Sequence, residues 1–106
     1  MNYPPFCDII LFNISSRDKN KVELATRKLH NLLMKNKEKY KINIELFKPV
    51  VAPISKIKNH YRWRISAKCK LGNSVVNYIN NTLEEYYGLK IKDVRVVADS
   101  NPNNMN

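Results

Sequence analysis

The sequence between positions 61 and 69 reads Tyr61-Arg62-Trp63-Arg64-Ile65-Ser66-Ala67-Lys68-Cys69. Apolar and polar side chains alternate along it with a period of two, which is the pattern of a β-strand that buries one face. The apolar side chains would point into a core, and the opposite face would present Arg62, Arg64 and Lys68 to solvent. The segment therefore predicts a rigid strand with a cationic surface that can bind anions.

The segment before this strand, residues 48–60, contains two prolines and several lysines. Pro49 and Pro53 cannot donate hydrogen bonds to a neighbouring strand, so we expect a connector here. Loops of this length in small domains tend to be functional or mobile. This connector would add Lys56 and Lys58 to the cations of the strand.

Three further strands are expected. Residues 7–14 form an almost continuous apolar run, which indicates a strand buried on most of both faces and therefore central in a sheet. Residues 42–47 and 92–98 alternate between apolar and polar side chains, as half-buried strands do. With the strand at 61–70, the chain would contribute four strands.

A first helix is expected at residues 19–37. Ser16, Asp18 and Asn20 are all competent N-caps, and Asn20 with Glu23 has the spacing of a capping box. The apolar side chains fall on one face at helical spacing. They are Val22, Ala25, Leu29, Leu32 and Leu33.

A second helix would begin at a cap formed by Asn73 or Ser74 and end at Gly88 in a left-handed conformation. Its predicted buried face consists of Val76, Ile79, Leu83 and either Tyr86 or Tyr87.

The order strand, helix, strand, strand, helix, strand predicts an α+β fold of the ferredoxin-like βαββαβ type. Right-handed crossovers would place both helices on one face of a four-stranded antiparallel sheet. We expect one domain over residues 1–106, because a chain of this length supports one core. Residues 1–5 would be a lead-in, and the polar residues 99–106 a flexible tail outside the sheet.

The net charge is +10, from 19 lysines and arginines against 9 acidic residues. So large a charge on a small chain favours polyanionic partners, with nucleic acid first and a solvated lysine-rich surface as the plainer alternative. No long apolar run is present, so we expect no membrane partner. Two cysteines and the lack of a signal peptide pattern favour a cytoplasmic location.

The sequence shows no constellation typical of catalysis. With two glycines it has no phosphate-cradling loop, and Cys7, His30, His60 and Cys69 lack the local spacing of zinc ligands. We therefore expect no catalytic residue, metal or cofactor in these residues. Trp63 is predicted to belong to the core, and the role of Tyr61 stays open.

Four short motifs follow one another along the chain: Tyr3-Pro4-Pro5-Phe6, Ala52-Pro53-Ile54-Ser55-Lys56-Ile57, Tyr61-Arg62-Trp63-Arg64-Ile65 and Asp99-Ser100-Asn101-Pro102. Together and in this order they resemble one family, the C-terminal domain of the bacterial replication-restart helicase PriA (primosomal protein N′). The resemblance implies that these residues are a piece of a longer, ATP-dependent DNA helicase, with the sites for ATP, magnesium and zinc elsewhere in that parent. It also implies a fold like that of a small-subunit ribosomal protein.

The resemblance further implies binding to single-stranded or forked DNA at stalled replication forks. Partners would be the rest of the helicase, the single-stranded-DNA-binding protein and other primosome proteins. The residues expected to contact DNA are Lys56, Lys58, Tyr61, Arg62, Arg64 and Lys68, with Tyr61 as a candidate stacking group. Two alternatives stay open: a structural module that docks on the helicase core and binds partner proteins, and an RNA-binding protein of ribosomal type.

Overall fold

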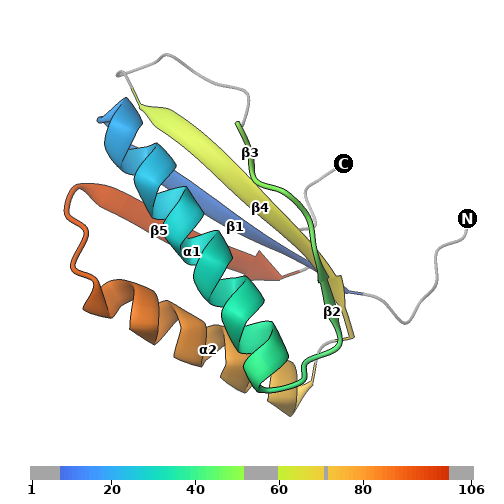
Figure 1. The fold of residues 1–106 in the computed structure, drawn as a ribbon. Coiled ribbons are helices and arrows are strands. Elements are labelled where there is room, and N and C mark those ends of the chain that lie inside the picture. The colour runs from blue at the N-terminus through green and yellow to red at the C-terminus, as the bar shows by residue number, and fades with distance from the viewer. Residues whose placement is uncertain (1–7, 52–59, 71, 101–106) are drawn as a thin grey trace, which may run out of the picture.

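The structure, a computed structural model, describes residues 8–51, 60–70 and 72–100. Its elements are β1 (Asp8–Ser16), α1 (Lys19–Lys39), β2 (Ile44–Leu46), β3 (Val50–Val51), β4 (Tyr61–Cys69), α2 (Asn73–Gly88) and β5 (Val94–Ser100). The sheet has the order β2-β4-β1-β5, and β3 also pairs with β4. Every pair is antiparallel, and both helices lie on the same side of the sheet (Figure 1). The predicted ferredoxin-like α+β fold is confirmed, with one additional short strand.

The pairing of β1 with β4 forms the centre of the sheet. It runs from Asp8 opposite Cys69 to Ser16 opposite Tyr61. On the helix side of β4, Ile65 and Ala67 are fully buried and Trp63 packs against the core, as the alternating pattern predicts. The arginines and lysine of β4 are therefore held on the side that faces away from the helices.

The core lies between the sheet and the two helices. It is built from the inward side chains of four strands, those of β5 being partly buried, and one face of each helix. Its fully buried large side chains include Phe12, Ile14, Leu29, Leu33, Ile65 and Tyr78.

The prediction that β1 is buried on both faces was wrong. Ile10, Phe12 and Ile14 are buried, but Ile9 on the opposite face is 42% exposed. The reason is the position of the helices: both crossovers return on the same side, so no described helix covers the other face (Figure 1). β1 is central in strand order, as predicted, while only one of its faces is packed.

The edge of the sheet beside β4 differs from the prediction. Leu46 lies opposite Ala67, and Val50 lies opposite Arg64, so the edge has one more residue than β4 between these two pairs. This extra residue makes a bulge, and the bulge contains Pro49, which has no N–H to donate. Val50 and Val51 then resume pairing as β3, inside the segment predicted to be a connector.

The predictions for both ends of α2 were wrong. Gly72 in extended conformation is its N-cap, without a side-chain cap hydrogen bond, so Asn73 is the first helical residue and not the cap. Gly88 is the last helical residue and does not have a positive φ. The left-handed residue is Lys90, with a φ of 54°.

The predicted buried face of α2 was right in part: Tyr86 is buried, and Ile79 and Leu83 pack against the core. Val76 is instead 46% exposed, whereas Val75 and Thr82 are buried. The packed face contains tyrosines and a threonine, which a pattern of aliphatic residues does not detect. Its buried residues are Val75, Tyr78, Thr82 and Tyr86.

The last strand extends beyond its predicted end. Asp99 lies opposite Leu11, and Ser100 lies opposite Ile10, so both residues belong to β5. Their side chains are polar, but backbone hydrogen bonding to the central strand does not depend on side-chain polarity. The other residues of the expected lead-in and tail, 1–5 and 101–106, lie outside the described residues.

Two tyrosines of α2 differ in hydrogen bonding although both are buried. The Tyr78 hydroxyl donates a 2.8 Å hydrogen bond to the Leu33 carbonyl of α1. The Tyr86 hydroxyl is buried without a hydrogen-bond partner in the part of the chain that the structure describes. Burial raises the pKa of both hydroxyls, with Cys69 adding to the effect at Tyr78 and Tyr87 at Tyr86.

We expect Tyr78→Phe to lower the free energy of unfolding by about 1 kcal/mol, because it removes a buried hydrogen bond. Tyr86→Phe should leave stability unchanged or raise it by up to about 1 kcal/mol, since it removes an unsatisfied buried hydroxyl. Urea unfolding of both variants and of Tyr87→Phe, an exposed control, measures this difference. Equal losses for Tyr78→Phe and Tyr86→Phe would contradict the hydrogen-bond assignment.

The partial burial of His30 in α1 predicts that the stability of the fold depends on pH. Burial lowers its pKa below the usual 6.5, and a hydrogen bond with the Phe47 backbone opposes this more weakly. The unfolded chain therefore binds a proton at a higher pH than the folded chain does. The contribution of His30 to the free energy of unfolding should be fully present above about pH 6.5. It should decrease as the pH falls from there toward the lower pKa that His30 has in the folded chain.

The measurement is the melting temperature of the natural chain and of His30→Gln at pH 7.5 and pH 5.5. The melting temperature of the variant should fall less between pH 7.5 and pH 5.5 than that of the natural chain, because the unfolded variant has no proton to gain at this position. Equal losses would show that His30 does not cause the pH dependence.

Candidate nucleic-acid interface

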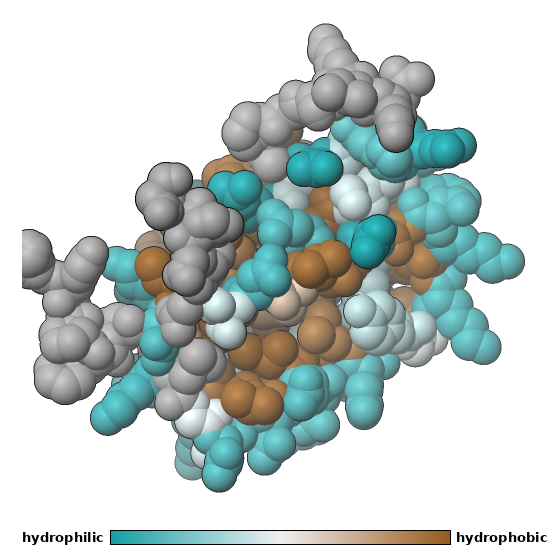
Figure 2. Space-filling view, turned by 180° about the vertical axis from the view of Figure 1, so that it is seen from behind, coloured by the Kyte–Doolittle hydropathy of each residue, from teal (hydrophilic) through white to brown (hydrophobic). Residues whose placement is uncertain are grey.

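The side of the sheet away from the helices is called the open sheet face below. Its central part combines cationic and apolar side chains from three strands. The residues assigned to it by strand alternation and register are Ile9, Leu11, Asn13 and Ser15 of β1, Arg62, Arg64, Ser66 and Lys68 of β4, and Arg95, Val97 and Asp99 of β5. Figure 2 looks onto this face and shows hydrophobic side chains gathered in its middle, with hydrophilic ones around them.

The cations of the open sheet face are ordered by the strand register. Ser15 of β1 lies opposite Arg62 on one side and opposite Arg95 on the other, which gives a row of arginine, serine and arginine across three strands. Arg64 lies opposite Asn13, and Lys68 lies opposite Ile9. Because the strands are rigid, the backbone spacings between these residues are fixed before any ligand binds.

These cations have no carboxylate partner among the described residues. The ion pairs found there join Lys21 to Asp93, Arg27 to Glu23 and Lys35 to Glu85. On the open sheet face Arg64 makes a long contact of 3.4 Å from its Nε to the Oδ1 of Asn13, which is a neutral partner. The positive charge of this face is therefore available to a partner.

The apolar part of the open sheet face lies between and beside the cations. Ile9 and Val97 are exposed, and Leu11 between them is partly exposed. Phe47, which follows β2, is 37% exposed, and the Lys68 Nζ lies 6.0 Å from its ring centroid. Strand alternation after the inward Leu46 places Phe47 on this same face.

The structure brings together three of the six residues predicted to contact DNA. Arg62, Arg64 and Lys68 share the open sheet face. Tyr61 lies on the other face at the start of β4, opposite the buried Ser16, and is 43% exposed. Its side chain is therefore on the opposite side of β4 from the arginines, and Lys56 and Lys58 lie outside the described residues.

Sequence reasoning missed three residues beside these cations. Arg95 reaches the open sheet face through the pairing of β5 with β1, and Phe47 reaches it because it follows the inward Leu46 and lies opposite Ser66 of β4. Arg17 lies in the turn directly after β1, where no periodic pattern applies. The alternation of Arg95 with Val94 and Val96 was a usable signal for Arg95, once β5 is placed next to β1.

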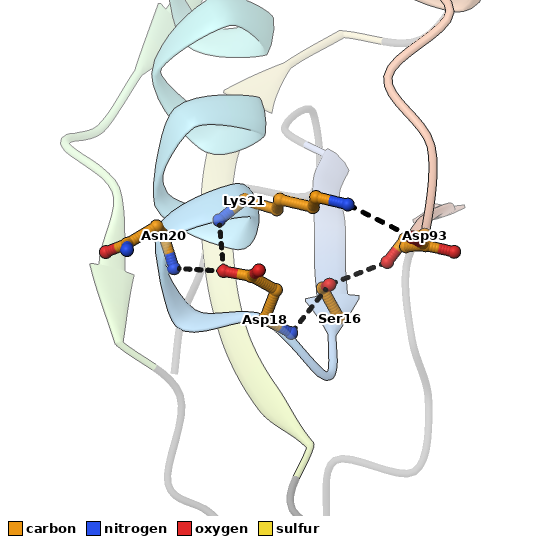
Figure 3. Close-up of polar contacts among 5 residues, drawn as sticks. All are labelled: Ser16, Asp18, Asn20, Lys21 and Asp93. Carbon is orange, nitrogen blue, oxygen red and sulfur yellow. Dashed lines mark hydrogen bonds and ion pairs between the residues drawn. The ribbon is translucent and has the colours of Figure 1, made fainter.

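A polar network fixes the end of the sheet where Arg62 and Arg95 lie (Figure 3). The Ser16 hydroxyl donates a 2.6 Å hydrogen bond to the Asp93 carbonyl and accepts one of 3.0 Å from the Asp18 N–H. The Lys21 Nζ lies 3.1 Å from the Asp93 carboxylate. The network joins the end of β1, the start of α1 and the residue before β5.

Asp18 is the N-cap of α1, and its Oδ1 accepts hydrogen bonds from the N–H groups of Asn20 (2.9 Å) and Lys21 (3.1 Å). The predicted capping box beginning at Asn20 was wrong, because Asn20 already lies in the first helical turn. Asp18 was one of the three predicted candidates for the cap.

In the described ranges no group of three or more histidine, cysteine or acidic side chains is placed to hold a metal ion. Neither α1 nor α2, the helices of the described part of the chain, is long and apolar enough to cross a membrane.

Several solved structures share this fold at low sequence identity. A de novo designed protein, Foldit4, superposes with a TM-score of 0.62 at 11% identity, covering 92% of this chain and 98% of its own. A dimeric ferredoxin-like protein from an uncultured marine organism gives a TM-score of 0.53 at 14% identity, covering 89% and 92%. These similarities establish the ferredoxin-like fold and carry no information on function.

Sequence comparison identifies the family. No curated protein is similar enough in sequence to match the chain. The family model described as primosomal protein N C-terminal domain matches residues 1–103, which confirms the resemblance seen in the motifs. The chain therefore belongs to the primosomal protein N C-terminal domain family.

Proposed function

We propose that this chain is a non-catalytic DNA-binding domain of a replication-restart helicase, and that it binds DNA on the open sheet face. The observation that carries the proposal is the set of cations on this face, which have no carboxylate partner among the described residues. Family membership supports the role in replication restart. Phosphate contacts by such cations give affinity and orientation without reading base sequence.

The mixture of charge and apolar surface favours DNA with unpaired bases. Duplex DNA presents phosphates outward and stacks its bases inside, so it would meet the cations and leave the apolar side chains uncovered. A single strand also exposes base faces, which can pack on Phe47 and on the aliphatic side chains around Leu11. We therefore expect the domain to prefer single-stranded or forked DNA over a continuous duplex.

In the longer helicase this domain would position DNA for the ATP-dependent motor, in the company of other primosome proteins. The sites for ATP, magnesium and zinc would belong to the rest of that protein. The contribution of this chain is electrostatic and geometric, since rigid strands hold the cations at set spacings.

The test is a triple variant that changes Arg62, Arg64 and Lys68 to alanine. It should bind single-stranded and forked oligonucleotides more weakly. The slope of log Kd against log salt should decrease by up to about 2, because each phosphate that is no longer neutralised on a single strand accounts for about 0.7. Fluorescence anisotropy at several salt concentrations measures both quantities.

The matched control removes three exposed lysines of α1, changing Lys28, Lys35 and Lys39 to alanine. It lowers the net charge equally and leaves the open sheet face intact. If the two triple variants lose affinity to the same extent, overall charge would explain the binding. Unchanged affinity in the sheet variant would remove this face from the proposed function.

A second candidate function is docking on protein, and the apolar centre of the open sheet face favours it. Exposed apolar side chains that gather on one face commonly mark a protein interface (Figure 2). The two functions differ in a simple measurement. A docking module would not bind oligonucleotides at physiological salt, whereas the first proposal requires that it does.

A further inference from the structure

Three arginines with no ion-pair partner among the described residues lie at one end of the open sheet face. Arg62 and Arg95 come from β4 and β5, and Arg17 comes from the turn between β1 and α1. All three are exposed. Together with Ser15 and His60 they line a depression at this end of the molecule.

The strand register sets the geometry of this depression. Arg62 and Arg95 flank Ser15 on its two neighbouring strands, so their backbones lie about 10 Å apart with the serine midway. Each guanidinium is a planar donor suited to two oxygens of one anion. The Ser15 hydroxyl has no hydrogen-bond partner among the described residues and adds a donor between them.

The acidic residues of the same depression are already engaged. Asp18 caps α1 with its carboxylate, and the carboxylate of Asp93 pairs with Lys21 (Figure 3). Asp93 itself has a φ of 64°, and its carbonyl accepts from Ser16, which fixes the start of β5 and hence the position of Arg95. The three arginines thus make no direct ion pair among the described residues, and hydrogen bonds hold the backbone around them in place.

We propose that Arg17, Arg62, Arg95 and Ser15 form a binding site for phosphate groups of a DNA strand, named here the arginine end. A single carboxylate needs one arginine, whereas three arginines around a hydroxyl match adjacent phosphates that repeat along a strand. The proposal rests on the proposed function for the nature of the ligand. The new element is that the DNA strand is anchored at this end of the sheet, with Arg17 and Arg95 as contact residues.

The first test uses Arg17→Ala and Arg95→Ala, each titrated with a single-stranded oligothymidylate. Each variant should bind severalfold more weakly and reduce the slope of log Kd against log salt by about 0.7, because one phosphate contact is removed. Arg27→Ala is the matched control, since Arg27 is an exposed arginine of α1 that pairs with Glu23 at 3.6 Å. If both test variants behave like this control while the natural chain binds the oligonucleotide, the arginine end is refuted and the proposed function stands.

A second variant should act in the opposite direction. Asp93→Asn removes the carboxylate next to the arginines and releases Lys21, while asparagine tolerates the positive φ at this position. Binding of the oligothymidylate should become tighter, and the melting temperature should change little because the ion pair is exposed. Weaker binding by a folded Asp93→Asn variant would overturn the proposal.

A third measurement separates this proposal from the proposed function. Inorganic pyrophosphate should shift the backbone amide resonances of Ser15, Arg17 and Arg95 in a ¹⁵N spectrum, even if the chain binds no oligonucleotide. Hexa-aspartate at equal concentration should shift them much less. Equal response to hexa-aspartate would identify an acidic protein segment as the ligand class, and no response to pyrophosphate would overturn the phosphate site.

Discussion

The antiparallel pairing of β1 with β4 is the constraint on which the other features depend. Phe12 lies opposite Ile65 in the core, and this register places Arg64 opposite Asn13 on the outside. Because side chains alternate strictly, a slip of one residue would turn the apolar side chains out and bring Arg64 toward the core. Burying an unpaired guanidinium costs far more than the hydrophobic gain of one position, so core packing and cation display are fixed together.

Neither described helix covers the open sheet face (Figure 1). Both crossover connections return on the helix side, and the core is complete with α1 and α2 there (Figure 1). The side chains of Ile9 and Val97 on the opposite face are exposed to solvent, which is unfavourable for an isolated sheet. Its interruption by arginines and a lysine keeps the apolar surface from being continuous, which limits association of sheet with sheet.

The sequence pattern was sufficient for the order of elements and for the cations of β4, because both depend on local periodicity. It was insufficient wherever the answer depended on neighbours far along the chain. Arg95 joins the arginine end only because β5 pairs with β1, and Val50 is a strand residue only because β4 offers it a partner past the bulge. The start of α2 illustrates a further limit, since the helix begins after Gly72 although Asn73 and Ser74 have the stronger capping preference.

The positions of the acidic residues determine which cations of this basic chain have a carboxylate partner. On the helices, Glu23 pairs with Arg27 and Glu85 pairs with Lys35, and both ion pairs are exposed, so these two cations are partly neutralised. At the arginine end, the carboxylates of Asp18 and Asp93 are used to cap α1 and to pair with Lys21. The two acidic residues at this end of the fold, Asp18 and Asp93, are therefore engaged in contacts that hold the fold together. The arginines beside them are left to contact a partner, so stability and recognition depend on different side chains.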